Sequence, residues 1–431
     1  MSKNQIISKN LGEVVDLFQG LAINAKTKHL LSHRGLSLWR IKDLIDGKSE
    51  QFIDSEKAPQ KSIVNEDDVI VTRTGQVGLV FRGKKGVLHN NSFKVIPNEK
   101  ILTKRYLYWF LRQSRIYKYL NQIASGSVQK DLNHDLFKSV RINIPLLADQ
   151  NKISEIFDVI EKKITLNKKT NETLEEIAQS LFKSWFIDFD PVKAKAEGHS
   201  NRLPNAIRDL FPDSFEDSEL GKIPYGWEVI SLKEMLETVS DTYPIKNKEK
   251  VVFLNTGDIE SGNFLNTNYS STQGLPGQAK KSIVRGDILF SEIRPKNNRH
   301  AYVYFDANDY VVSTKLMVLR SKYRGNSLFE YFLITQKSSI NYLQLLAESR
   351  SGTFPQITFS ELNEIKFALP KNKHLINFFT DNYLENSFSK SQNIKRQNKN
   401  LENIRNVLLP KLISGELRIS DIENKIEEVV I

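Results

Sequence analysis

An internal repeat with a period of roughly 225 residues limits what this chain can fold into, because that period is far longer than a solenoid unit and indicates two homologous halves. Four short blocks recur in the same order and at similar spacing. Within the first block, Asp43 matches Asp258 and Gly47 matches Gly262. The matched blocks are residues 39–47 with 254–262, 62–71 with 282–290, 125–127 with 351–353, and 140–145 with 365–370.

Each half shows the same order of predicted elements. Short runs rich in Val, Ile, Phe and Tyr predict strands at residues 69–72, 79–82 and 93–96, and again at 251–254, 287–291, 301–305 and 316–319. One helix is predicted after the strands of each half, over residues 105–120 and 328–347. A proline and a long helical stretch then close each half. This order predicts an α+β module followed by a long helix, twice.

The first long helix is predicted over residues 149–186. Polar Asn167 and Asn171 occupy the middle of a heptad seam, where such residues lower stability but fix register and partner. An ordinary amphipathic helix with a frayed middle is the alternative. The apolar seam residues are Ile153, Phe157, Ile160, Ile164, Leu174, Ala178, Leu181 and Trp185.

The second long helix is predicted over residues 375–409, ended by Pro410. Asn393 and Asn398 make its middle polar as well, which suits antiparallel pairing of the two helices. Between residues 371 and 411, eight basic residues outnumber three acidic ones, so this helix faces phosphates or an acidic partner, or is a solvated basic face. Its seam residues, which complete the predicted helix-pair interface, are Leu384, Phe388, Ile394, Leu401, Ile404 and Leu408.

The expected fold class is therefore α+β, with two homologous α/β modules joined by two long antiparallel coiled-coil helices in a pseudo-twofold arrangement. The expected boundaries are 1–148 for the first module, 149–187 for the first helix, 188–221 for a connector, 222–370 for the second module, 371–411 for the second helix and 412–431 for a tail. The connector is acidic, so we expect an ordered linker and not a DNA surface. Since the first half lacks a counterpart of residues 223–227, we expect its module to be trimmed at the N-terminus, with the tail packing there.

Composition narrows the possible functions. The chain has no cysteine, which excludes disulfide scaffolds, cysteine nucleophiles and Cys-based zinc sites. Its formal net charge of +11 points to a polyanionic partner, although a Lys- and Asn-rich composition can also reflect genomic base bias. No apolar run approaches the ~20 residues that cross a bilayer. With no apolar run behind the N-terminal lysines, we expect a cytoplasmic protein without a membrane partner.

Residues 181–198 (LFKSWFIDFDPVKAKAEG) resemble the central conserved region of type I restriction–modification specificity subunits. Residues 220–227 (LGKIPYGW) resemble the start of that family's second recognition domain, and 408–417 (LLPKLISGEL) its distal conserved region. The resemblance implies a DNA-recognition subunit, in which each module is a target-recognition domain for one half of a bipartite site and the helix pair sets the gap. A helix of ~38 residues is about 57 Å long, comparable to some 15 base pairs.

The resemblance also implies partners: double-stranded DNA, two methyltransferase (M) subunits and two restriction (R) subunits. S-adenosylmethionine, ATP and magnesium would be bound by those partners, and no cofactor by this chain. The sequence itself contains no P-loop, no G-x-G and no Pro-Pro pair. Of its two E-x-K strings, the one at 161–163 lies on the first long helix, and the one at 364–366 has no preceding aspartate to complete a nuclease metal site. His29 and His33 have no carboxylate partner motif for a metal. We therefore expect neither catalytic nor metal-binding residues; the alternatives are a stand-alone methyltransferase or nuclease, and a coiled-coil adaptor.

Candidate DNA contacts are polar residues on loops that contain Gly or Pro, since base edges are read by Arg, Lys, Asn, Gln, Ser and Thr. Gly75 and Gly126 can instead serve only as turns, and Arg73 can instead pair with an acid inside its module. The predicted base readers are Arg73, Thr74, Gln76, Ser127, Gln129 and Lys130 in the first half, and Arg294, Lys296, Asn297, Arg299, Arg350 and Thr353 in the second. The predicted phosphate contacts are Lys84, Lys85, Lys280 and Lys281.

Overall fold

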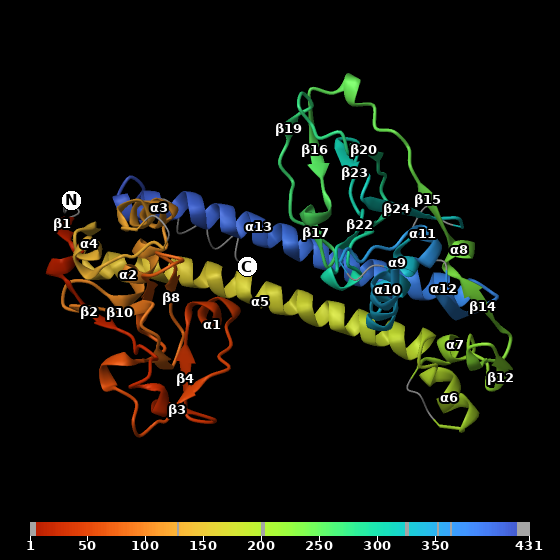
Figure 1. Ribbon diagram of the computed structural model, residues 1–431, viewed down its shortest axis with the longest axis horizontal. Helices are drawn as coiled ribbons and strands as arrows, with labels where there is room; N and C mark the ends of the chain where they lie inside the picture. Colours follow the sequence, from red (N-terminus) through yellow and green to blue (C-terminus); the bar gives the residue numbers. More distant parts are fainter. Residues whose placement is uncertain are drawn as a thin grey trace. The chain divides into compact units, whose positions relative to one another are not determined.

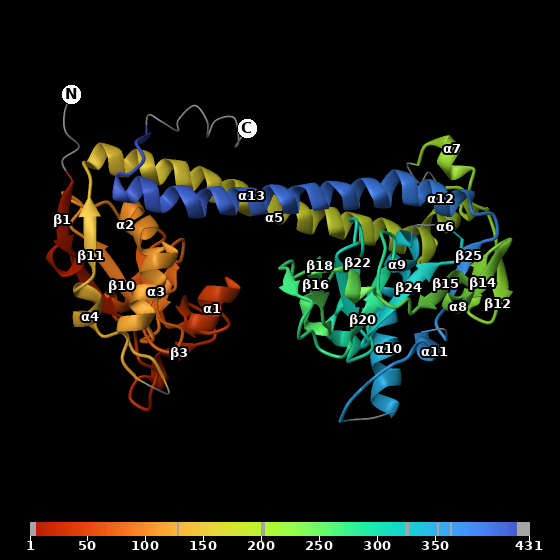
Figure 2. The same ribbon diagram turned by 90° about the horizontal axis from the view of Figure 1, so that it is seen from above.

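The computed structural model describes residues 6–126, 129–199, 203–323, 327–350, 353–362 and 364–419 (Figures 1 and 2). The chain divides into two compact units: unit 1 is Met1–Lys169 with Ile394–Ile431, and unit 2 is Thr170–Asn393. The division falls within both long helices, so each unit contains one module and a segment of each helix. No helix in the described ranges is long and apolar enough to cross a membrane.

The module of unit 1 contains three sheets. The strand order is β2-β10-β7-β8 in the first sheet and β3-β5-β4-β9-β6 in the second, where β4 and β9 run parallel. In the third, β1 pairs antiparallel with β11. The bounds are β1 Ile7–Asn10, β2 Val15–Gln19, β3 Leu31–Ser32, β4 Leu36–Trp39, β5 Phe52–Ile53, β6 Ile63–Val64, β7 Val69–Thr72, β8 Val80–Phe81, β9 Gly86–Leu88, β10 Ser92–Pro97 and β11 Arg141–Ile144.

The module of unit 2 repeats most of this plan, although its second sheet has four strands and not five. Its sheets have the orders β15-β24-β21-β22 and β19-β16-β23-β20, with β16 and β23 parallel, and β14 pairs with β25. Two hairpins, β12-β13 and β17-β18, are additional. The bounds are β12 Phe215–Ser218, β13 Gly221–Pro224, β14 Trp227–Ser231, β15 Leu236–Val239, β16 Lys250–Leu254, β17 Ile259–Glu260, β18 Asn263–Phe264, β19 Ser270–Ser271, β20 Ala279–Ser282, β21 Ile288–Ser291, β22 His300–Tyr302, β23 Tyr310–Ser313, β24 Leu316–Ser321 and β25 Lys366–Pro370.

The predicted repeat is confirmed down to single hydrogen bonds. The carboxylate of Asp43 accepts from the backbone N–H three residues earlier, at 3.1 Å, and that of Asp258 does the same at 2.7 Å. Gly47 and Gly262 follow in the left-handed conformation, with φ of 76° and 78°, which glycine adopts at little steric cost. Equivalent residues therefore close equivalent turns in the two halves.

The single helix predicted after each set of strands is wrong in both halves, because two helices occur there. In the first, Gln113 is extended (φ −62°, ψ 136°) and separates α2 from α3. In the second, α9 ends at Ile334 and α10 begins at Lys337. The bounds of the shorter helices are α1 Ile41–Asp46, α2 Lys104–Leu111, α3 Ser114–Ile123, α4 His134–Lys138, α6 Asp190–Ala196, α7 Asn205–Arg208, α8 Leu232–Met235, α9 Leu328–Ile334, α10 Lys337–Arg350 and α11 Phe359–Leu362.

The first long helix, α5, spans Leu147–Phe186, close to its predicted bounds. The second consists of α12 (His374–Phe379), a π-helical turn at Thr380–Leu384, and α13 (Glu385–Ser414). The predicted stop at Pro410 is wrong, because the helix continues through it. Leu409, Leu412 and Ile413 are buried on both sides of the proline, and their burial compensates for the backbone hydrogen bond that proline cannot make.

The N-terminal expectation is confirmed in part. β1 pairs with β11 just as β14 pairs with β25, so the first module does have a counterpart of the strand that begins at Trp227. What its described residues lack is a counterpart of the β12-β13 hairpin. The chain beyond α13 does pack there: a Cβ on Gly415 would lie 3.0 Å from Ile6 Cδ1, and Leu417 contacts the buried core of unit 1. The tail from residue 420 onward lies outside the described residues.

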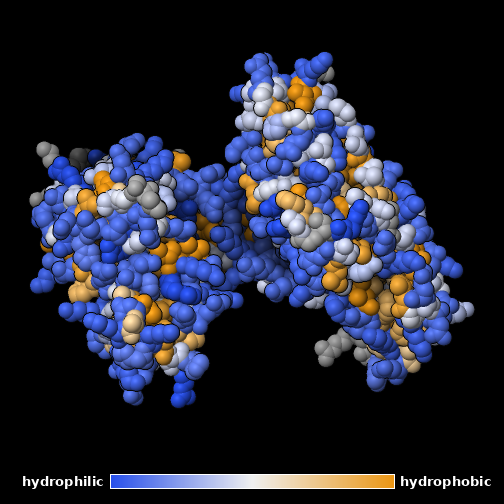
Figure 3. All heavy atoms as spheres, in the orientation of Figure 1, coloured by the Kyte–Doolittle hydropathy of each residue, from blue (hydrophilic) through white to orange (hydrophobic). Residues whose placement is uncertain are grey.

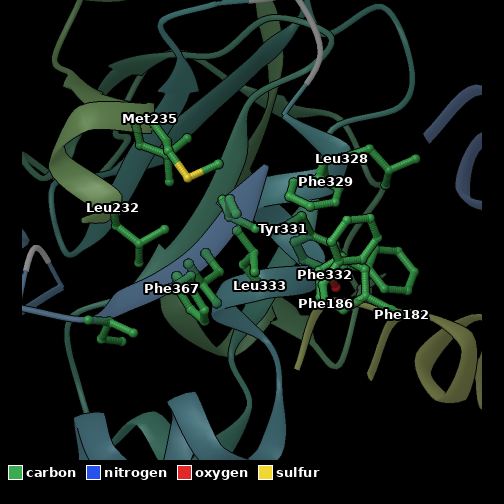
Figure 4. Close-up of a cluster of buried hydrophobic side chains, with 14 of the residues drawn as sticks. Phe182, Phe186, Leu232, Met235, Leu328, Phe329, Tyr331, Phe332, Leu333 and Phe367 are labelled. Carbon is green, nitrogen blue, oxygen red and sulfur yellow. The ribbon is translucent and has the colours of Figure 1, made fainter. Parts of the chain in front are cut away.

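Each unit has one large core that joins its module to its helix segments. In unit 1, Phe157 and Leu401 of the two long helices are buried together with Trp109 of α2. In unit 2, Phe182 and Phe186 of α5 pack among Phe329 and Phe332 of α9, as Figure 4 shows. The helices therefore take part in the cores of the modules and are not separate rods.

Candidate nucleic-acid interface

In the first module, the two loops singled out from sequence are held together by Asp131. Arg73 and Thr74 directly follow β7, and Asp131 lies at the end of the second loop. The Asp131 carboxylate accepts from Arg73 Nη2 at 2.7 and 2.8 Å and from Thr74 Oγ1 at 2.9 Å. The Gly75 N–H donates to Lys130 O at 2.9 Å. The two loops, although far apart in sequence, therefore lie side by side and form one surface.

Arg73 stabilises the two loops from the inside of the module. Its side chain is 18% exposed, its guanidinium pairs with Asp131, and its Nε atom is buried with no hydrogen-bond partner. The interpretation of Arg73 as an internal ion pair is thus the one that fits the structure. Gly126 is also structural, since its φ is 99° and a Cβ there would meet the Gln129 carbonyl oxygen at 2.3 Å. These residues shape the loops that carry the exposed side chains.

Among the predicted base readers of the first module that the structure describes, Gln76, Gln129 and Lys130 are exposed and Thr74 is half-buried. Lys130 Nζ donates to the carbonyl of Asn121, at 2.8 Å, so its ammonium is directed to the end of α3. A Cβ on Gly75 would lie 4.0 Å from Gln129 Nε2, which places the two loops side by side. Ser127 lies outside the described residues. Gln76 and Gln129 therefore present exposed amides, which can both donate and accept hydrogen bonds.

In the second module the equivalent loops meet in the same way. The Arg294 N–H donates to Pro355 O at 3.0 Å, and the Ile357 N–H donates to Glu292 O at 2.9 Å. Arg294 (φ 45°) and Asn298 (φ 52°) adopt left-handed conformations that non-glycine residues rarely occupy. Such strain is maintained only where surrounding contacts impose it, and it is concentrated at functional sites.

The other predicted residues of the second module are placed differently from one another. Lys296, Asn297 and Thr353 are exposed. Arg350 is exposed but forms an ion pair with Glu361. The remaining one, Arg299, is half-buried, with Nη1 3.5 Å from Thr256 Oγ1. Arg294, Lys296 and Asn297 are therefore the groups of this loop best able to reach a ligand.

The four predicted phosphate contacts also differ in exposure. Lys85 and Lys280 are exposed. Lys84 Nζ lies 4.6 Å from the centre of the Trp39 ring, a cation–π contact. Lys281 is half-buried, and its Nζ donates to the carbonyls of Leu316 at 2.8 Å and Thr314 at 3.3 Å. Burial lowers the pKa of Lys281, so this residue is a poor phosphate contact.

Exposed apolar side chains at the same loops were not identified from the sequence. Phe354, beside Thr353, is 67% exposed, and Leu345 on α10 is 64% exposed. Figure 2 shows α10 projecting from the sheets of its module. Tyr117 and Tyr119 are exposed on α3, the equivalent helix of the first module. These two tyrosines could have been detected in the sequence as aromatic residues at otherwise polar helix positions. Outside such side chains, Figure 3 shows a mostly hydrophilic face on each unit.

The predicted helix-pair residues divide between the two cores. Asn167 is buried, and its Nδ2 donates to Asn398 Oδ1 and Gln397 Oε1, both at 2.8 Å. Asn171 Oδ1 is buried without a hydrogen-bond partner. The residues that pack in the core of unit 1 are Ile153, Phe157, Ile160, Ile164, Leu401 and Leu408, and those in the core of unit 2 are Leu181, Leu384 and Phe388. Leu174 and Ile394 are half-buried.

The helices of unit 1 run antiparallel. Asn167 of α5 contacts Asn398, whereas Glu161, earlier on α5, contacts Arg405, later on α13. Among the described residues, no group of three or more His, Asp or Glu side chains could hold a metal ion.

Comparison with known proteins agrees with this architecture. The family model described as "Type I restriction modification DNA specificity domain" matches residues 6–176 and 224–405. The HindI specificity subunit of Haemophilus influenzae is 42% identical over 147 residues, which are 33% of this chain and 32% of that protein. The MjaIX specificity subunit of Methanocaldococcus jannaschii is 26% identical over 366 residues, which are 82% of this chain and 78% of that protein.

A solved structure gives the same picture for the fold. The crystal structure of a type I restriction–modification S subunit from M. genitalium matches with a TM-score of 0.60 at 14% identity, covering 96% of this chain and 97% of that one. The family model matches once per module and covers most of the chain, and each match extends into the long helices. Together with the repeated modules and paired loops, this shows that the chain belongs to the family of type I restriction–modification DNA specificity domains.

Proposed function

We propose that this chain is the non-catalytic DNA-reading subunit of a type I restriction–modification enzyme, acting in the cytoplasm. Its first module would read one half of a bipartite site, its second module the other half, and the helix pair would set the gap. The observation that carries this proposal is the recurrence of one loop pair, residues 73–76 with 129–131 and residues 292–297 with 353–357, on the same scaffold. The exposed side chains differ between the two loop pairs, as two different half-sites require.

The chemistry of the loops supports base recognition. Gln76 and Gln129 carry amides, which can make paired hydrogen bonds to adenine. Arg294 and Lys296 carry cations, which suit the acceptors O6 and N7 of guanine. Lys85 and Lys280 are exposed and would contact phosphates, which fix register without reading sequence.

The catalytic work would belong to partners. Under this proposal the chain assembles with two methyltransferase subunits, which bind S-adenosylmethionine, and with two restriction subunits, which use ATP and magnesium. Purified chain should then neither methylate nor cleave DNA. Robust activity of the chain alone would instead favour a stand-alone methyltransferase or nuclease.

A half-site test addresses the central claim. Mapping N6-methyladenine in the host genome would define the site, and binding of the full chain to duplexes with single base changes would follow. We expect Gln76→Ala to relax recognition in one half-site only and Arg294→Ala in the other, each costing about 1–3 kcal/mol at the base concerned. If both variants relaxed the same half-site, the assignment of modules to half-sites would be wrong.

Two adjacent lysines provide a matched pair for the phosphate contacts. Lys280→Gln should lower the slope of log K against log salt by about 0.9, because one counterion fewer is released. Lys281→Gln should leave that slope unchanged, since Lys281 is already bound to backbone carbonyls. Equal slopes for the two variants would remove Lys280 from the interface.

A further inference from the structure

Two carboxylates on α5 join the first module to the helix pair within unit 1. Asp158 accepts from Trp109 Nε1 at 2.9 Å and from Arg105 Nε at 2.8 Å, and it also forms an ion pair with Arg82. Arg105 and Trp109 belong to α2, and Arg82 directly follows β8. A single acid of the long helix is therefore bound by two separate elements of the module.

Glu161, three residues later on α5, links the module to the second long helix. Its Oε1 accepts from Arg112 Nη1 at 3.1 Å, and its Oε2 accepts from Arg405 Nη1 of α13 at 2.8 Å. Arg112 also donates to the Tyr108 hydroxyl at 2.6 Å. Glu161 thus lies between the module and α13, with one carboxylate oxygen bound to each.

Aromatic rings fix the direction of these guanidinium groups. Arg82 lies 4.3 Å from the centre of the Tyr108 ring, and Arg112 lies 5.3 Å from the centres of the Tyr108 and Trp109 rings. A planar guanidinium that is stacked on a ring and hydrogen-bonded at its edge has few orientations left. This network therefore restrains rotation of the module about α5 in addition to holding it there.

The acids of this network are partly or fully removed from solvent, whereas Arg105 at its margin has a side chain that is 47% exposed. Asp158 is 8% exposed, and Glu161 is half-buried. Burial opposes ionisation of Glu161, but the charges of Arg112 and Arg405 outweigh burial and hold its pKa below the ordinary value. Glu161 therefore remains an anion at neutral pH. The apolar contact beside them, Trp109 on Phe157 at 5.5 Å, adds stability but little direction.

We propose that Asp158 and Glu161 are positioning residues, which set the angle at which the first module is held on the helix pair and thereby the gap between half-sites that the chain accepts. This inference rests on the proposed function, since a gap matters only to a bipartite reader. The two acids do not touch DNA in this view. They act through the module, by way of the arginines that bind them.

The test uses the full chain and the variants Asp158→Asn and Glu161→Gln, which keep the shape and remove the charge. Binding is measured to the complete site with its native gap, to sites with the gap one base pair longer or shorter, and to a duplex holding the first half-site alone. We expect the isolated half-site to bind as in the parent chain, within about twofold. Affinity for the native-gap site should fall roughly tenfold, and the preference over altered gaps should shrink, because linked modules gain affinity only when their geometry matches the ligand.

Glu155→Gln is the matched control, since Glu155 is an exposed acid one turn earlier on α5; it should retain native binding and gap preference. If Asp158→Asn does not fold, Glu161→Gln alone decides. Full retention of gap preference in the variants would overturn the proposal and leave the proposed function intact. Equal losses on the isolated half-site and the complete site would also overturn it, by showing a merely structural role. Absence of any site-specific binding by the parent chain would instead contradict the proposed function.

Discussion

The two modules share the order of one four-stranded sheet and a parallel strand pair in the other, but they are attached to the long helices by different chemistry. In unit 1, Arg112 directly follows α2 and binds Glu161 of α5. In unit 2, the residue that directly follows α9 is Thr335, and the attachment is mainly aromatic, with one neutral hydrogen bond from Gln336 Nε2 to Gln179 Oε1 of α5 at 2.6 Å. Phe182 of α5 lies 5.1 Å from Phe329, measured between ring centres (Figure 4). Its ring centre is also 5.9 Å from that of Phe379.

An attachment between a module and a helix has to meet two requirements, stability and a fixed orientation, and the two units meet them by different contacts. Apolar burial supplies stability in proportion to area and is indifferent to direction. Stacked and hydrogen-bonded guanidinium groups supply direction, although their net stability is reduced by the cost of removing charges from water. A fold can therefore be duplicated while its mode of attachment is not, and each attachment can be perturbed separately.

The largest expected effect comes from the aromatic attachment. Phe182→Ala should lower the free energy of unfolding of unit 2 by about 3–5 kcal/mol, because it leaves a cavity in a fully buried cluster. Hydrogen exchange read by mass spectrometry should show the loss in α9 and not in α2. Phe182→Leu, which keeps more of the volume, should cost less. A loss below about 1 kcal/mol would mean that the aromatic cluster is not what holds this module.

A buried histidine gives the next effect, again in unit 2. Burial lowers the pKa of His300 to about 4 from an ordinary 6.5, and its Nδ1 lies 3.0 Å from the Tyr331 hydroxyl. As pH falls from 6.5 towards 4, the unfolded chain binds a proton that the folded chain refuses, so stability present above pH 6.5 is lost. The loss at pH 5 should be about 2 kcal/mol. Exchange of α9 and β22 at pH 7 and pH 5 measures it, and a His300→Gln variant with unchanged acid sensitivity would contradict it.

The smallest effect concerns the polar contact between the helices of unit 1. Asn398→Leu should cost about 1–2 kcal/mol, because it removes a hydrogen-bond acceptor from buried Asn167. The double variant Asn167→Leu with Asn398→Leu should recover that loss. Urea denaturation of both single variants and the double variant gives the coupling. Additive losses would show that the two amides act independently.

The sequence predicted those parts of the fold that repeat or that contain long apolar runs. Strands such as β7, β21 and β24 are runs of Val, Ile and Leu, and the first long helix has a clear heptad seam. Strands outside these runs were missed: β3, β5 and β6 have only two residues each, and β2, β4 and β15 have four or five but include polar side chains. The end of the second helix was misplaced because burial beyond Pro410, a tertiary effect, overrides the local rule.

The candidate site was predictable as a set of loops but not as individual side chains. The interaction of Arg73 with Asp131 joins residues 58 positions apart, and no local pattern indicates such a pair. Lys280 and Lys281 differ because neighbours on β20 point to opposite faces. Asp158 was overlooked, since an acid beside a heptad seam resembles any solvated helix position until its arginine partners are known.

Unit 1 is built from both ends of the chain, which determines when its core can form during synthesis. Unit 2 is one uninterrupted segment, whereas the core of unit 1 includes Leu401, Leu409 and Ile413. The module that leaves the ribosome first must therefore wait for almost the whole polypeptide before its apolar surface is covered. A stop codon near residue 395 would harm the N-terminal module more than the one translated immediately before the stop, and would leave it prone to aggregation or proteolysis.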